Sequence, residues 1–174
     1  ISVGLNIKSE KIYSSLKNTE GLFMATLHEI EVIIAEFTEK YRREEFSKIR
    51  KSRVYKLSPD QSTTNNNEYC WPQTWPNNDY PGVYAILSGD EVLYIGKASL
   101  QILGYRLSSY FKYSKDRKSA VPNTSHVWSK PPTGVVTWAV PHELFFEASA
   151  LEEFLIYKLK DKLPDNRVGT GKWK

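Results

Sequence analysis

The chain has 174 residues, of which 40% are hydrophobic, 13% aromatic and 25% charged. This size and composition fit one compact domain with an appendage, leave little room for two full-sized domains, and exclude general disorder. A formal net charge of +4 permits binding to a polyanion but is modest for a dedicated nucleic-acid coat protein.

Cysteine content and hydropathy narrow the class of protein further. Cys70 is the only cysteine, so no internal disulfide forms, and a reducing, cytoplasmic location is expected. No Cys/His cluster offers a zinc site. The longest apolar runs, such as residues 31–37, carry charges and fall far short of the roughly 20 residues that span a bilayer. We expect neither a membrane-spanning segment nor a signal peptide.

The first predicted element is a long helix over residues 22–55. Apolar residues recur there at steps of three and four, as on one helix face, and Asn18 or Thr19 is a candidate N-cap. The second half of this segment, residues 40–56, is strongly basic. It is either an ordinary solvated helix face or a surface that contacts phosphates.

The remaining elements follow in chain order after a segment that shows no sustained period. That segment, residues 58–79, is expected to be a loop joining two units. We predict a hairpin at residues 82–95, a helix at 100–111 and a polar excursion at 112–134. A strand at 135–140 and a final helix at 144–163 follow. The expected fold class is α+β: a small three-stranded antiparallel sheet flanked by helices, with an N-terminal long-helix extension.

Five short fragments follow one another along residues 81–166, about half of the chain. They are Pro81-Gly82-Val83-Tyr84, Tyr94-Ile95-Gly96-Lys97, Arg106-Leu107-Ser108-Ser109-Tyr110-Phe111, and two later segments with Glu152 and Asn166, residues 150–156 and 163–166. Each is short, but together, in this order, they resemble the GIY-YIG nuclease family. The version in the incision subunit of bacterial excision repair is the most similar, and GIY-YIG restriction endonucleases share the pattern.

The resemblance implies a metal-dependent DNA endonuclease with residues 81–174 as its GIY-YIG-like domain. It implies that the site contains Tyr84, Tyr94, Lys97, Arg106, Glu152 and Asn166. Tyr84 would be the general base, aided by positive charge from Lys97 or Arg106, and Tyr94 would position water or phosphate. Glu152 would hold a single Mg²⁺ or Mn²⁺, and Asn166 would support the phosphate-binding geometry. The implied partner is double-stranded DNA, and a homodimer is one possible assembly.

The loop of the predicted hairpin decides whether the two tyrosines share a face. They do so if they are opposed or offset by an even number of residues. A three-residue loop, Ser88-Gly89-Asp90, pairs Leu87 with Glu91 and therefore Tyr84 with Tyr94. A two-residue loop would put the tyrosines on opposite faces. We therefore predict the three-residue loop, and expect Gly82 and Gly96 to allow close approach of a backbone or a phosphate.

Helical periodicity selects between two adjacent glutamates. At about 100° per residue, Glu152 falls within the apolar stripe of its helix, whereas Glu153 falls on the far side. An inward carboxylate is hydrogen-bonded, ion-paired or metal-bound. No cation is evident nearby in the sequence, so a bound metal is the interpretation that agrees with the resemblance.

The cationic candidates have ordinary alternatives. Arg106 lies at the edge of an apolar helical stripe, from which it either reaches a phosphate or extends to solvent. Lys97 either neutralises a phosphate or helps activate water, or it faces solvent at a strand end. His126 and His142 lie in Pro-rich loops and are assigned no role.

A sequence-specific, restriction-type endonuclease is the function we expect. Residues 1–80, a helical extension and loop, are expected to serve DNA binding or dimerisation, and residues 112–134 to add recognition contacts. The alternatives are a repair, mobile-element or toxin nuclease of the same fold, and a catalytically silent nucleic-acid-binding module.

Overall fold

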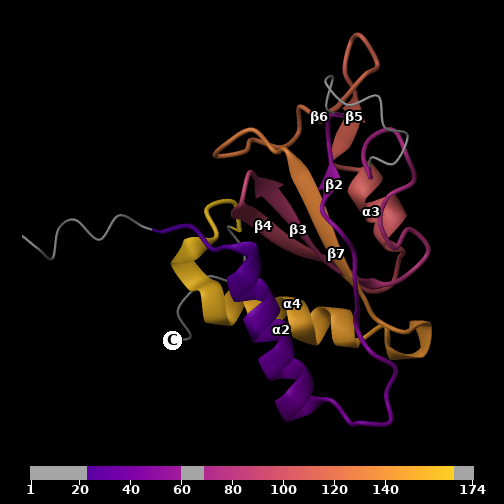
Figure 1. The fold of residues 1–174 in the computed structure, drawn as a ribbon, viewed down its shortest axis with the longest axis vertical. Helices are drawn as coiled ribbons and strands as arrows, with labels where there is room; N and C mark the ends of the chain where they lie inside the picture. The colour runs from indigo at the N-terminus through magenta and orange to yellow at the C-terminus, as the bar shows by residue number, and fades with distance from the viewer. Residues whose placement is uncertain (1–22, 60–68, 167–174) are drawn as a thin grey trace, which may run out of the picture.

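The computed structural model describes residues 23–59 and 69–166. The elements in chain order are α2 (Leu27–Tyr41), β1 (Arg50–Lys51), β2 (Tyr55–Lys56), β3 (Gly82–Ser88), β4 (Glu91–Ala98), α3 (Leu103–Ser108), β5 (Phe111–Tyr113), β6 (Ala120–Pro122), β7 (Gly134–Ala139) and α4 (Glu147–Leu159). Two short 3₁₀ turns, His142–Leu144 and Lys160–Lys162, flank α4. Figure 1 shows α2 and α4 together on one side of a central sheet, with α3 and the β5–β6 hairpin on the other.

The main sheet confirms the α+β class with antiparallel strands. Its order is β1-β7-β3-β4, β2 also pairs with β7, and every pair of these strands is antiparallel. The three predicted strands form its centre, but the predicted number of strands was too low. β1 and β2 have two residues each, too few to show a strand period in the sequence.

The start of α2 differs from the prediction. Thr26 and Glu29 form a reciprocal capping box, in which each side chain accepts from the backbone N–H of the other. The candidate caps Asn18 and Thr19 lie outside the described residues. The sequence contains the capping-box pattern Thr26-x-x-Glu29. At this spacing the two side chains satisfy two free backbone N–H groups at the start of the helix.

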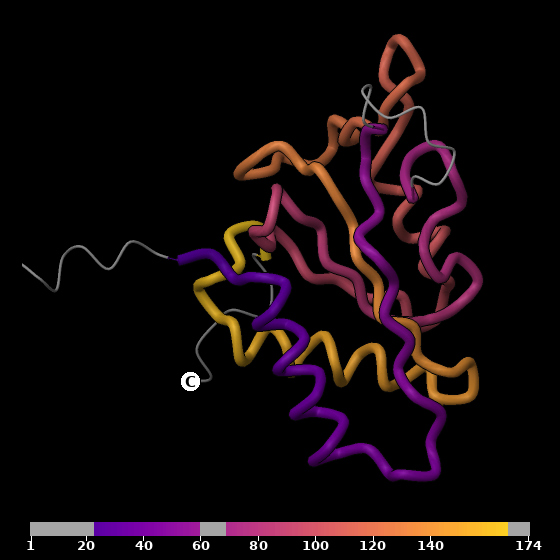
Figure 2. Tube along the Cα trace, viewed as in Figure 1, coloured from indigo at the N-terminus to yellow at the C-terminus, as the bar shows by residue number. Residues whose placement is uncertain are grey.

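The end of α2 corrects the predicted helix more strongly. The helix stops at Tyr41, because Arg42 adopts an extended conformation and pairs with buried Glu147 at 3.0 Å. Residues 42–56 therefore do not continue the helix, and their basic side chains do not share a helix face. Figure 2 shows the chain leaving α2 and running along the sheet, where β1 and β2 pair with β7.

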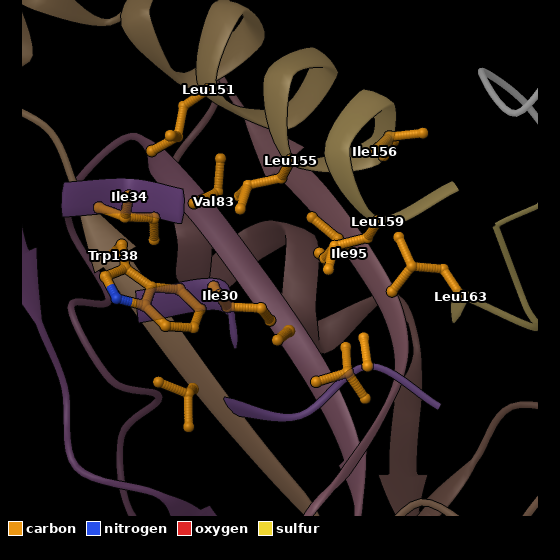
Figure 3. Close-up of a cluster of buried hydrophobic side chains, with 14 of the residues drawn as sticks. Ile30, Ile34, Val83, Ile95, Trp138, Leu151, Leu155, Ile156, Leu159 and Leu163 are labelled. Atoms are coloured by element: carbon orange, nitrogen blue, oxygen red, sulfur yellow. The ribbon is translucent and has the colours of Figure 1, made fainter. Parts of the chain in front are cut away.

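Both faces of the sheet are buried, and their compositions differ. The face under α2 and α4, called the aliphatic face below, is built mainly from Ile30, Ile34, Val83, Ile95, Trp138, Leu151 and Leu155 (Figure 3). The opposite face, called the aromatic face, is built mainly from Tyr55, Trp71, Trp75, Tyr84, Leu103, Leu107, Tyr110 and Phe111. Side chains of β3 alternate between the two faces, as a doubly buried strand requires.

The β3–β4 loop is shorter than predicted. Ser88 pairs with Glu91, so the loop contains only Gly89 and Asp90. Gly89 has φ 60°, a left-handed conformation that glycine adopts without steric cost. The prediction of a three-residue loop is therefore wrong.

A β-bulge nevertheless brings the two tyrosines to the same face. The register shifts between Leu87, which pairs with Val92, and Ile86, which pairs with Tyr94, so that Leu93 is the extra residue. Tyr84 then pairs with Gly96, two residues along from Tyr94. This even offset places both tyrosines on the aromatic face, although the two-residue loop alone would have separated them.

The segments before and after residue 81 share one sheet and one core. Trp71 and Trp75, from the predicted linking loop, pack on the aromatic face. The predicted helix at 100–111 is shortened to α3, and the excursion at 112–134 contains the β5–β6 hairpin. β7 and α4 lie where a strand and a helix were expected. None of the helices in the described parts of the chain is long and apolar enough to cross a membrane.

Candidate active site

A surface pocket of about 380 Å³ lies at the C-terminal end of β4. It is lined by Lys97, Ser99, Leu100, Gln101, Arg106 and Glu152. Three of the six predicted site residues therefore meet there, each from a different element: Lys97 from β4, Arg106 from α3 and Glu152 from α4. They are distant in sequence, and the packing of both helices against the sheet brings them together.

The orientation of Glu152 agrees with the periodicity prediction. Its side chain is 15% exposed, whereas Glu153 is exposed. Its partner, however, was not anticipated: the Nζ of Lys97 lies 2.9 Å from Oε2 of Glu152. The inward carboxylate thus has a cation beside it. In the described ranges, no group of three or more His, Cys, Asp or Glu side chains is arranged to hold a metal.

Three tyrosine hydroxyls form a chain behind this pocket. Tyr84 donates to the hydroxyl of Tyr110 at 3.0 Å, and Tyr110 donates to that of Tyr94 at 3.5 Å. Tyr84 is completely buried, while Tyr94 is partly exposed. Of the two predicted tyrosines, Tyr94 is therefore the one that solvent reaches.

Burial controls the acidity of these phenols. It raises the pKa of Tyr84 and of Tyr94 well above the ordinary value for tyrosine, and neighbouring Tyr110 raises both further. Arg106 acts in the opposite direction on both, but by less. In the free protein both phenols are therefore protonated at neutral pH.

Arg106 connects the pocket to the tyrosines. Its Cζ lies 5.4 Å from the ring centroid of Tyr110, in the range of a cation–π contact. Its Nε is buried and has no hydrogen-bond partner among the described residues. A buried guanidinium N–H without an acceptor is costly.

Two glycines make room for the site in different ways. A Cβ on Gly82 would lie 2.2 Å from the carbonyl oxygen of Trp138, so this glycine allows close approach of the β7 backbone, as predicted. A Cβ on Gly96 would lie 2.4 Å from the hydroxyl of Tyr84 and 2.7 Å from the ring of Tyr94. Gly96 therefore accommodates tyrosine side chains, where a backbone or phosphate was expected.

Asn166 is buried and does not line the pocket. Its amide nitrogen donates to the carbonyl of Ile95 at 2.7 Å, and its amide oxygen accepts from the N–H of Ile95 at 2.9 Å. These bonds fix the backbone of β4 between Tyr94 and Gly96. The structure therefore shows Asn166 holding the backbone of β4, and not lining the pocket.

Tyr110 was missed as a site residue, although the sequence contained a signal. It follows Arg106 by four residues, the spacing at which side chains on a helical turn lie on one side. His126 and Trp128 were also missed: their ring centroids lie 4.5 and 6.0 Å from that of Tyr110. The irregular loop that carries these two has no period from which their position follows.

The comparisons with known proteins supply no relative. A scan against models of protein families finds no match to this chain, and searches of curated proteins and of solved structures find none either.

Proposed function

We propose that the protein is a metal-dependent endonuclease that hydrolyses phosphodiester bonds of double-stranded DNA, most specifically a restriction-type enzyme. One observation carries the proposal. A single pocket combines a carboxylate, a lysine and an arginine, and the arginine also contacts the ring of Tyr110 in a chain of tyrosine hydroxyls. Phosphodiester hydrolysis needs those groups: donors for the phosphate oxygens, a group to orient water and a ligand for a cation.

The donor atoms at the pocket fit a hard divalent cation. Glu152 supplies a carboxylate, and Ser99 and Gln101, which have oxygen atoms in their side chains, line the same pocket. Mg²⁺ is commonly held by one or two carboxylates, with water and substrate phosphate completing its six ligands. Bound at Glu152, Mg²⁺ or Mn²⁺ would supply stabilisation of negative charge on the departing 3′ oxygen.

Lys97 and Arg106 act on the scissile phosphate. Lys97 is held next to Glu152 and reaches the pocket as a single positive charge, whereas the guanidinium of Arg106 offers several N–H donors. Together they neutralise the phosphate in the ground state and the additional charge that develops as water attacks phosphorus. Loss of either is expected to slow cleavage more than it weakens DNA binding.

The geometry favours Tyr94 over Tyr84 for contact with the attacking water. The resemblance implied Tyr84 as the general base, but its hydroxyl is buried and bonded to Tyr110. Tyr94 is partly exposed and accepts from Tyr110. In the proposal, the Tyr94 hydroxyl orients the water by hydrogen bonding, Arg106 lowers the pKa of Tyr94, and Tyr84 with Tyr110 holds the Tyr94 side chain in place.

Cleavage of supercoiled plasmid tests the proposal. The purified chain should nick or linearise the plasmid with Mg²⁺ and fail to do so with EDTA. Sequencing the ends should return one short motif for a restriction-type enzyme and scattered ends for a repair, mobile-element or toxin nuclease. DNA binding without any Mg²⁺-dependent cleavage would support the silent nucleic-acid-binding module instead.

A further inference from the structure

The β5–β6 hairpin, residues 111–122, is a basic feature that projects from the described structure. Its exposed charged side chains are Lys112, Lys115, Asp116, Arg117 and Lys118. They amount to four cations against one carboxylate. Figure 1 shows this basic hairpin extending beyond the end of the main sheet. The hairpin is a separate two-stranded sheet. Phe111 and Ala120 at its base join the aromatic core, and Tyr113 packs edge-on against Trp71.

The tip of the basic hairpin is held by its own hydrogen bonds. The backbone N–H of Ser114 donates to the carbonyl of Ser119 at 2.9 Å, which closes the loop. The carboxylate of Asp116 accepts from the Ser114 hydroxyl and from the backbone N–H of Lys118. The single acidic group is therefore occupied within the turn. A tip fixed in this way loses little conformational entropy when it binds a partner.

Within the described residues, no ion pair neutralises the lysines of the tip. No ion pair in the described part of the chain includes Lys112, Lys115 or Lys118. Arg117 has its Cζ 5.3 Å from the ring centroid of Tyr113, and its φ of 61° is part of the turn. The exposed lysines are thus available to an external polyanion, while Arg117 also serves the shape of the hairpin.

The base of the basic hairpin is attached to the candidate active site. Tyr110, the middle tyrosine of the hydroxyl chain, directly precedes β5. Asn123, directly after β6, donates from its backbone to the carbonyl of Tyr110 and from its amide to the carbonyl of Ser109, both at 2.7 Å. A partner on the hairpin is therefore held at a fixed distance from the pocket.

We propose that the basic hairpin binds duplex DNA next to the cleaved bond, with Lys115 and Lys118 contacting backbone phosphates. Charge complementarity identifies the partner, because duplex DNA is the polyanion that the proposed nuclease must hold. A two-stranded ribbon is also one of the protein elements that the major groove admits. This inference rests on the proposed function for its partner, but it concerns a surface outside the pocket.

The test compares two charge-matched double variants of the full chain. Lys115→Ala with Lys118→Ala removes two cations from the tip and leaves Arg117 in place. Arg43→Ala with Lys48→Ala removes two exposed cations from the loop after α2, at the far end of the molecule (Figure 1). Dissociation constants for a fluorescently labelled duplex are measured without Mg²⁺ over a series of salt concentrations.

Each phosphate contact contributes about 0.9 to the slope of log affinity against log salt concentration. The slope should therefore fall by about 1.8 in the tip variant and stay unchanged in the control variant. A slope in the tip variant equal to that of the wild-type chain would overturn the inference, whatever the absolute affinity.

Plasmid cleavage by the same wild-type preparation separates the two proposals. Cleavage by wild type together with a tip-variant slope equal to that of wild type rejects the basic hairpin as a DNA-binding surface and leaves the nuclease standing. A smaller slope in the tip variant together with no cleavage supports the hairpin and rejects the catalytic proposal.

Discussion

The two faces of the main sheet are equally buried but chemically different. The aliphatic face is packed by α2 and α4 with branched side chains, whereas the aromatic face contains tyrosine hydroxyls and lies against Arg106. The pocket forms at the end of β4, where Glu152 of α4 meets Lys97 and Arg106. One face thus maintains the fold, the other supplies the polar groups, and the candidate site lies where side chains from both sides converge.

The largest expected effect concerns the helices over the aliphatic face. Arg42 and Glu147 form an ion pair with side chains 3% and 8% exposed. Arg42→Met would leave the carboxylate of Glu147 buried without its partner, which typically costs about 3–5 kcal/mol of unfolding free energy. Urea denaturation measures this loss, and cleavage per folded molecule should be unchanged.

The matched control for that substitution is Arg43→Met. Arg43 is 74% exposed, and its contact with Glu45 is at the surface, so its removal should change stability by less than about 1 kcal/mol. A similar loss in both variants would show that the buried pair does not stabilise the packing of α2 on α4.

The fold could be predicted from the sequence where side-chain periodicity is strong. β3, β7 and α4 have six or more residues in one pattern, and Glu152 was placed correctly by helical spacing. β1 and β2 could not be predicted, because two residues cannot show a period. The end of α2 could not be predicted either, because a run of basic residues such as 42–56 is equally compatible with a helix and with a loop.

The candidate site was only partly predictable, because much of it depends on tertiary contacts. The bulge at Leu93 compensates for the short loop, so the two tyrosines share a face although the predicted register was wrong. The Lys97–Glu152 pair joins residues 55 positions apart, and the packing of His126 on Tyr110 depends on an irregular loop. No local pattern encodes either contact.

Gly96→Ala should damage the aromatic face with an intermediate effect. The added Cβ would overlap Tyr84 and Tyr94, and overpacking of this kind costs about 1–3 kcal/mol. Because the displaced side chains belong to the hydroxyl chain, cleavage should also fall, beyond what the loss of folded protein explains. Thermal melting and plasmid cleavage, measured on the same preparation, check both parts.

Gly89→Ala provides the comparison for that variant. Its φ of 60° makes alanine unfavourable by roughly 1–2 kcal/mol, but no atom lies within 4 Å of the added Cβ. Stability should fall by a similar amount while cleavage is retained. If Gly89→Ala lost as much cleavage as Gly96→Ala, the tyrosine cluster would have no special role.

The smallest expected effect is on stability at alkaline pH. Burial raises the pKa of Tyr84 above that of the unfolded chain, about 10, so the unfolded state releases its proton first as pH rises. The contribution of Tyr84 to the free energy of unfolding should therefore be constant below about pH 9 and fall above pH 10. Tyr84→Phe should show a smaller fall in urea denaturation, and an identical pH dependence would mean that this phenol titrates normally.

The central claim is that the pocket containing Glu152 cleaves DNA, and the neighbouring glutamate offers the most direct test. Glu152→Gln and Glu153→Gln remove the same charge from adjacent positions of α4, one beside Lys97 and one exposed to solvent. Single-turnover cleavage of plasmid with saturating Mg²⁺, combined with DNA-binding affinity, should be measured for both. Glu152→Gln should bind DNA but lose cleavage by about 10²- to 10³-fold, the scale of losing one main charge-stabilising group, while Glu153→Gln should match wild type. Equal cleavage by the two variants would contradict the central claim.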